Sequence, residues 1–367
     1  MRRLLGNIAL ALVVFLLMLV LAEGAWRLLI SKGDRARHFD PVIGRVNPPN
    51  TSWTIRTPEY KTSMSTNSRG FRGPEMPGDR RSNEMRILFL GDSFVEAKQV
   101  PVQERFVEET GRILEKKMNR PVTVRALAVG ASEPARELLY FEHIGTSFDP
   151  DIVVQVFFPE NDLLAVSGSY LLHRENSHLI LDRVWVDPLP LCDLKCWILS
   201  HSELAVRAYQ LLRQSRGTGS KDLRSLLGEG QFYWYTVEGQ EAAEREQRFD
   251  VLATFADAVR SRTEKNGGQY LAVLMPGGFE IHEDWQNDVL ARFEQAIPRT
   301  NWRPAGLLDG VTASLAERRI HTLDLRPSFR EAAPSGHLYF TLDPHLSPVG
   351  HRLTAERISE AISSLRP

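Results

Sequence analysis

Short, uninterrupted apolar runs recur along this chain, and segments with helical spacing separate them. An apolar run without polar alternation is typical of a strand that is buried on both faces of a parallel sheet. Residues 248–266 show the helical pattern, with apolar side chains three and four positions apart. Strands that alternate with helices predict an α/β fold around a mostly parallel sheet. The predicted strands lie at residues 87–90, 122–129, 151–158, 270–275 and 320–325.

The N-terminus carries Arg2 and Arg3, which precede an uncharged and mainly apolar run over residues 4–22. The run is about 19 residues long, close to the ~20 that a helix needs to cross the hydrocarbon core of a bilayer. Two arginines at the start of a chain favour a cytoplasmic N-terminus. We therefore expect a membrane anchor within residues 1–30, made of one transmembrane helix. The protein would be single-pass in the inner (cytoplasmic) membrane, with its catalytic domain extracytoplasmic, in the periplasm.

Two other interpretations of the apolar run stay open. Residues 20–22 could serve as the small-residue cleavage site of a signal peptide, although the apolar core of a cleaved signal is only about 7–15 residues long. A buried helix of a soluble domain is the third and least favoured interpretation. The length of the run favours an uncleaved anchor.

Charge and cysteine content bear on the class of protein. The 45 basic and 46 acidic residues give a formal net charge of -1, whereas a nucleic-acid-binding protein needs a strongly basic patch. We therefore expect no nucleic-acid partner. The two cysteines, Cys192 and Cys196, lack the second pair that a zinc ribbon needs. We expect no metal site, and whether these two thiols form a local disulfide stays open.

The sequence divides into three parts. The anchor is followed by residues 31–84, which are rich in proline, threonine, serine and glycine and predict short strands and turns that lead into the domain. The α/β domain takes residues 85–367. An insertion at about 164–247 interrupts the alternation of strands and helices in this domain. It contains a hairpin-like stretch at 179–181 and 184–186. Its position predicts a substrate-recognition cap at the rim of the active site.

Three polar motifs lie where the predicted fold could bring them together. A Gly-Asp-Ser tripeptide ends at Ser93 directly after a buried strand, which places this serine at the carboxyl edge of the sheet, where open α/β folds bind ligands. Asn161 follows another buried strand, and its amide can donate to a developing oxyanion. Asp343 and His345 can supply a general base and the carboxylate that orients it. Each motif alone is as typical of turns and helix caps, but the three together are far more specific.

The order and strand contexts of these motifs resemble the SGNH hydrolase family, also known as GDSL-like esterases, over the whole predicted α/β domain. The resemblance implies a three-layer α/β/α sandwich with a flavodoxin-like, mostly parallel sheet. It implies that Ser93 is the nucleophile, that His345 is the base and that Asp343 orients the base. It also implies an oxyanion hole made by the backbone N–H of Ser93, the side-chain amide of Asn161 and the backbone N–H of Gly130.

The chain departs from the family's pattern at three places. The second motif, residues 126–132, lacks the asparagine that is usual there. An alignment could therefore place Ala131 rather than Gly130 as the backbone donor, and either N–H could serve. Pro159 stands where many members have glycine, and one residue instead of two separates the last aspartate from its histidine.

Two histidines near the C-terminus compete for the role of base. His345 lies two residues from Asp343 in a predicted loop, whereas His351 is predicted to enter the terminal helix. We favour His345 because it can reach both a carboxylate and the serine. Upstream of the domain, residues 67–75 are similar to a segment of bacterial SGNH proteins that have an N-terminal anchor.

The resemblance implies acyl transfer through a Ser-His-Asp triad, without a metal or an organic cofactor. We expect an esterase that removes acyl, chiefly acetyl, groups from a carbohydrate or envelope glycan. A polysaccharide O-acetyltransferase is the first alternative, and it would need a membrane protein as acyl donor. A catalytically weak glycan-binding or scaffold protein is the second. The expected partners are therefore an acylated carbohydrate or other ester, and the membrane through the N-terminal helix.

Overall fold

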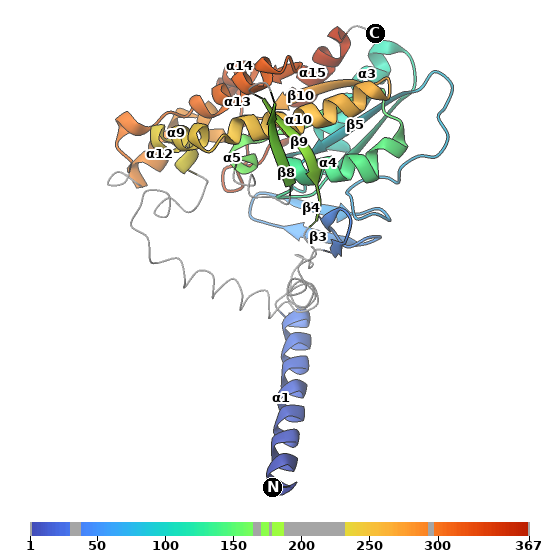
Figure 1. The fold of residues 1–367 in the computed structure, drawn as a ribbon, viewed down its shortest axis with the longest axis vertical. Helices are drawn as coiled ribbons and strands as arrows, with labels where there is room; N and C mark the ends of the chain where they lie inside the picture. Colours follow the sequence, from blue (N-terminus) through green and yellow to red (C-terminus); the bar gives the residue numbers. More distant parts are fainter. Residues whose placement is uncertain are drawn as a thin grey trace.

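A parallel sheet of five strands forms the centre of the molecule (Figure 1). The computed structural model describes residues 2–29, 38–163, 170–175, 178–186, 232–292 and 297–365. The strand order is β11-β10-β7-β5-β6, and every neighbouring pair is parallel. The predicted strands and the α/β fold with a mostly parallel sheet are therefore confirmed. The strands are β5 (Met85–Gly91), β6 (Val122–Ala128), β7 (Ile152–Phe157), β10 (Gln269–Leu274) and β11 (Thr322–Asp324).

Helices cover both faces of this sheet (Figure 1). Alternate residues of β5 enter two separate apolar cores, Leu88 and Leu90 on one face and Ile87 and Phe89 on the other, because successive side chains of a strand point to opposite faces. The first core also contains residues of α4, α10 and α13, and the second contains residues of α3, α14 and α15. The bounds are α3 (Phe106–Met118), α4 (Pro134–His143), α10 (Arg248–Lys265), α13 (Gly306–Glu317), α14 (Arg326–Ala332) and α15 (Pro348–Ser364).

Shorter helices connect these layers. Two of them, α2 (Ser93–Glu96) and α5 (Pro159–Asp162), begin directly after β5 and β7 and belong to the candidate site. The other short α-helices are α9 (Val237–Arg245), α11 (Gly278–Ile281) and α12 (Glu283–Arg292). The 3-10 turns are η1 (Val102–Glu104), η2 (Gly145–Phe148), η4 (Tyr233–Tyr235), η5 (Arg299–Asn301) and η6 (Ala333–Ser335).

The segment before β5 folds as two small antiparallel sheets. Strand β1 (His38–Asp40) pairs with β2 (Gly44–Val46), and β3 (Ser52–Arg56) pairs with β4 (Lys61–Ser65). Arg72, which follows them, is 3% exposed and donates to the backbone carbonyls of Glu96 at 3.1 Å and Val100 at 2.7 Å. These hydrogen bonds join the segment to the loop and helix that follow β5.

The described part of the insertion is a hairpin of β8 (Tyr170–Glu175) and β9 (His178–Val184), which packs on α10. The sequence-based expectation that residues 179–181 pair with 184–186 is wrong. Residues 179–184 form one continuous strand whose partner precedes it in the chain. Cys192 and Cys196 lie outside the described residues, as does most of the proposed cap.

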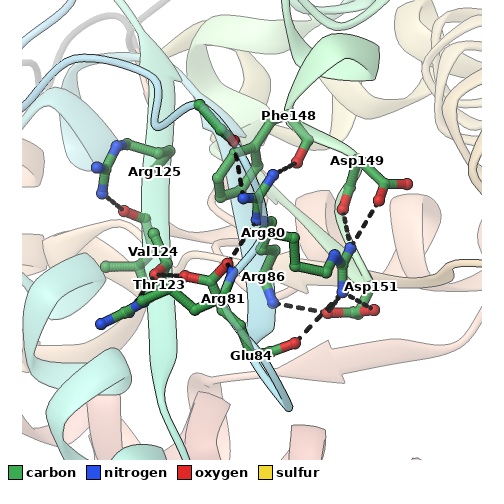
Figure 2. Close-up of polar contacts among 11 residues, drawn as sticks. Arg80, Arg81, Glu84, Arg86, Thr123, Val124, Arg125, Phe148, Asp149 and Asp151 are labelled. Carbon is green, nitrogen blue, oxygen red and sulfur yellow. Dashed lines mark hydrogen bonds and ion pairs between the residues drawn. The ribbon is translucent and has the colours of Figure 1, made fainter.

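A network of ion pairs lies at the amino ends of the strands of the central sheet (Figure 2). Arg86, near the start of β5, is buried and donates to Glu84 Oε2 at 2.9 Å. Arg80 donates to both carboxylate oxygens of Asp151 at 2.8 and 2.9 Å. Burial raises the pKa of Glu84, but hydrogen bonds from Thr123 and Arg86 outweigh burial and lower the pKa to about 2. The charged network stabilises this edge, and the candidate site lies at the opposite, carboxyl edge.

Helix α1 (Arg2–Leu29) stands apart from the layered domain (Figure 1). Several of its apolar side chains are exposed, among them Leu10, Leu17, Val20 and Leu21. Within the part of the chain that the structure describes, no helix meets both the length and the hydropathy needed to cross a membrane.

Candidate active site

Ser93 lies at the point where β5 ends and helix α2 begins. Asp92 is the N-cap of this helix, and its Oδ1 accepts the N–H of Phe94 at 2.9 Å. The residue before Asp92 must be a glycine, because a Cβ on Gly91 would lie 2.4 Å from a side-chain methyl of Val95. The tight strand-to-helix turn holds Ser93 at the carboxyl edge of the sheet, as the sequence predicted.

His345 joins Ser93 to Asp343. Ser93 Oγ lies 2.8 Å from His345 Nε2, and His345 Nδ1 is hydrogen-bonded to Asp343 Oδ1. With its proton on Nδ1, the imidazole donates to the carboxylate and accepts the hydroxyl proton of Ser93. The ring of Phe94 packs against the imidazole, with ring centroids 4.9 Å apart. The structure thus brings the predicted nucleophile, base and carboxylate together in the order that the triad chemistry needs.

Asp343 also accepts hydrogen bonds that the sequence did not reveal. Tyr60 Oη donates to Asp343 Oδ2 at 2.6 Å, and Gln99 Nε2 lies 3.2 Å from the same oxygen. Burial raises the pKa of Asp343, but the hydrogen bond and charge of His345, followed by the hydrogen bonds from Tyr60 and Gln99, bring it well below its usual range. Asp343 is therefore ionised throughout the neutral pH range and can stabilise a protonated His345.

Asn161 lies in α5, directly after β7, which pairs with β5. Its Nδ2 donates one hydrogen to Asp92 Oδ2 at 3.0 Å. An amide nitrogen carries two hydrogens, so the second is available to a ligand. The Asp92 contact also fixes the orientation of the amide, with nitrogen rather than oxygen near the serine turn.

The backbone N–H of Gly130, the predicted second donor, already has a partner. It donates to Glu96 Oε2 at 3.0 Å, and both residues are buried. This donor is therefore not available in this structure, contrary to the expectation from the sequence. Ala131, the alternative, is exposed and has φ 59°, and its N–H has no hydrogen-bond partner among the described residues. The left-handed conformation is uncommon for a residue other than glycine, and it turns the backbone after β6.

Three buried acids lie behind the serine turn. Burial raises the pKa of all three acids. The pKa of Glu137 rises to about 8, and that of Asp162 lies well above its usual range. Glu137 Oε2 accepts from Gln155 Nε2 at 2.8 Å, and Asp162 Oδ2 accepts the N–H of Phe158 at 2.7 Å. Burial beside other acids therefore favours the neutral form of the Glu137 carboxyl.

His351 lies in α15 and is 2% exposed. Its Nδ1 accepts the N–H of Phe106 at 3.3 Å, and its ring stacks on the Phe106 ring. Burial lowers the pKa of His351 to about 3, with the positive charge of Arg105 adding to the effect. His351 is thus a neutral part of the core, whereas His345 is the histidine at Ser93.

The described residues contain no group of three or more His, Cys, Asp or Glu side chains that could hold a metal ion.

Comparison with known proteins finds one family match, to the C-terminal part of the chain. Residues 226–367 match the family described as an SGNH hydrolase-like domain, acetyltransferase AlgX, a stretch that contains Asp343 and His345 but not Ser93. No curated protein matches the chain.

Solved structures similar to the chain are distant in sequence. A member of the lipolytic G-D-S-L family from Veillonella parvula is 13% identical, with TM-score 0.38, covering 77% of this chain and 100% of that one. A lipase/acylhydrolase from Enterococcus faecalis is 13% identical, with TM-score 0.38, covering 76% and 95%. A catalytic mutant of an acetylxylan esterase from Geobacillus stearothermophilus is 12% identical, with TM-score 0.40, covering 76% and 94%.

Proposed function

We propose that the chain is an SGNH-type enzyme, an extracytoplasmic serine esterase that removes acyl, chiefly acetyl, groups from a carbohydrate or envelope glycan. The family match over residues 226–367 supports this proposal. One observation carries the proposal: Ser93 Oγ lies 2.8 Å from His345 Nε2, and Asp343 is hydrogen-bonded to the other ring nitrogen. This arrangement suits acyl transfer, because it activates a hydroxyl as a nucleophile.

The first half-reaction acylates the serine. Ser93 Oγ attacks the ester carbonyl carbon while its proton moves to His345 Nε2, and Asp343 stabilises the imidazolium. The tetrahedral oxyanion accepts hydrogen bonds from the backbone N–H groups of Ser93 and Ala131 and from the free hydrogen of Asn161 Nδ2. The bond to the leaving oxygen then breaks, His345 returns its proton to that oxygen, and the acyl group remains on Ser93.

The second half-reaction releases the acyl group. A water molecule attacks the acyl-serine carbonyl and gives its proton to His345 Nε2. Collapse of the second tetrahedral intermediate breaks the bond to Ser93 Oγ, which recovers the proton from His345. The products are the free carboxylic acid and the regenerated serine.

A second candidate function follows from the family match. The matched family is described as an acetyltransferase, which favours a sugar hydroxyl rather than water as the acceptor in the second half-reaction. The triad chemistry is the same, and only the acceptor differs. An O-acetyltransferase would receive its acyl groups from a membrane protein acting as donor.

The acyl-ester proposal predicts that the full-length chain, purified in detergent, hydrolyses p-nitrophenyl acetate and is labelled by a serine-reactive fluorophosphonate. We expect the acetyl ester to be turned over faster than longer acyl esters. An oligosaccharide acceptor separates the two candidates: a transferase yields an acetylated sugar by mass spectrometry, whereas an esterase yields only acetate. A folded protein that neither hydrolyses the ester nor reacts with the fluorophosphonate would refute the esterase proposal.

We further propose that the N-terminal segment, residues 1–30, anchors the protein to the inner membrane, with the domain in the periplasm. The uncharged run at residues 4–22 and the exposed apolar side chains of α1, such as Leu17 and Leu21, support this, because exposed apolar patches mark membrane or partner contacts. We expect the full chain to stay with membranes after a carbonate wash and a chain without residues 1–29 to be released. Release of the full chain by the wash would refute the anchor.

A further inference from the structure

The segment before the α/β domain reaches the candidate active site. The turn between β3 and β4 contains Glu59 and Tyr60, and both contact the loop that carries Asp343 and His345. These contacts join residues more than 280 positions apart in the sequence. The hairpin therefore does more than lead the chain into the domain.

Glu59 fixes the backbone of the catalytic loop. Its Oε1 accepts the N–H of Thr341 at 2.6 Å, and its Oε2 accepts the N–H of Asp343 at 2.9 Å. A carboxylate that accepts two backbone N–H groups makes charge-assisted hydrogen bonds, which are stronger than neutral ones. The position of the Asp343 backbone is thus set from the β3–β4 turn.

Tyr60 fixes the carboxylate of the same residue. Its hydroxyl donates to Asp343 Oδ2 at 2.6 Å, while Asp343 Oδ1 is hydrogen-bonded to His345. The tyrosine ring packs against Phe340, with ring centroids 5.1 Å apart, which holds the hydroxyl in place. One oxygen of the carboxylate therefore faces the base and the other faces the hairpin.

Gln99 contacts the carboxylate from the loop after α2. Its Nε2 lies 3.3 Å from Asp343 Oδ1 and 3.2 Å from Oδ2, and the residue is 2% exposed. The contact spans both oxygens at longer distances than the single Tyr60 hydrogen bond. Tyr60 is accordingly the stronger constraint on rotation of the carboxylate.

We propose that Tyr60 is a positioning residue for the acyl transfer, acting through the carboxylate of Asp343 to hold His345 in the tautomer and orientation that face Ser93. The proposal rests on the proposed function for its kinetic consequence, but the contact itself is a property of the fold. Without the Tyr60 hydroxyl, Asp343 Oδ2 keeps only the longer Gln99 contact. The carboxylate is then held less firmly about its Cβ–Cγ bond, and the imidazole loses part of its orientation. Substrate binding needs none of these atoms, so the effect should fall on kcat and not on KM.

The test compares Tyr60→Phe with Tyr270→Phe in the full-length chain in detergent. Both substitutions remove one hydroxyl from a tyrosine that donates to a side-chain oxygen, since Tyr270 Oη donates to Gln155 Oε1 at 2.7 Å. We expect Tyr60→Phe to lower kcat for p-nitrophenyl acetate about tenfold with KM unchanged, since a hydrogen bond to a charged group is lost. Tyr270→Phe should lower the melting temperature while kcat stays near the wild-type value.

A second readout does not depend on activity. The Nδ1 proton of His345, followed by NMR in protein labelled with 15N-histidine, should give a downfield resonance that an Asp343→Asn variant lacks. We expect this resonance to move or broaden in Tyr60→Phe and to stay unchanged in Tyr270→Phe. An unchanged resonance and unchanged kcat in Tyr60→Phe would overturn the positioning role. If the wild type hydrolyses no ester, the proposed function fails, and the resonance alone decides the role of Tyr60.

Discussion

Replacing Ser93 with Ala is expected to remove nearly all ester hydrolysis, with kcat lowered by about 10⁴–10⁶-fold. The reason is chemical: the hydroxyl that faces His345 Nε2 at 2.8 Å is the proposed nucleophile, and alanine has no hydroxyl. The change removes one oxygen from a partly exposed residue, so the fold should not suffer. Steady-state assays with p-nitrophenyl acetate measure the loss of turnover. Labelling with the fluorophosphonate measures the loss of the covalent adduct.

The His345→Ala variant and the double variant sharpen this result. Residues that act as one unit are not additive, so Ser93→Ala combined with His345→Ala should be no slower than Ser93→Ala alone. Ser68→Ala is the matched control, because Ser68 is exposed and its hydroxyl donates to Glu75, away from the triad. Turnover that survives Ser93→Ala above the level of a buffer blank would assign the activity to another residue and refute this triad.

The sequence predicted the part of the site that depends on strand ends. Ser93 and Asn161 follow continuous apolar runs, and neighbouring parallel strands bring their carboxyl ends together. The spacing of Asp343 and His345 similarly allowed one side chain to support the other. These inferences needed only the local pattern and the topology that it implies, and the strand positions are confirmed by the structure.

The rest of the candidate site depends on contacts that no local sequence pattern encodes. Tyr60 and Gln99 meet Asp343 across separations of 283 and 244 residues, and nothing in the residues around them marks them as part of a site. The availability of a backbone N–H is equally hidden: Gly130 is occupied because the buried Glu96 lies opposite it. The pairing of β9 does not follow from the sequence, because a strand of alternating character can pair with either neighbour. Its partner, β8, precedes it in the chain.

The oxyanion donors give the second large effect. Asn161→Ala should lower kcat by about 10²–10³-fold with little change in KM, because the amide donates to charge that develops only in the transition state. The substitution also removes a hydrogen bond to Asp92 Oδ2, so thermal unfolding should accompany the kinetics to show that the serine turn remains folded. Steady-state kinetics with p-nitrophenyl acetate give the separation of kcat from KM.

Two comparisons make the Asn161 result specific. Asn266→Ala changes an exposed asparagine at the C-cap of α10 and should leave kcat near the wild-type value. Asn161→Asp keeps the size of the side chain but replaces the donor with a carboxylate that faces Asp92, so it should be at least as slow as Asn161→Ala. Unchanged kcat in Asn161→Ala would mean that the backbone N–H groups of Ser93 and Ala131 hold the oxyanion without the amide, and that Asn161 serves only to orient Asp92.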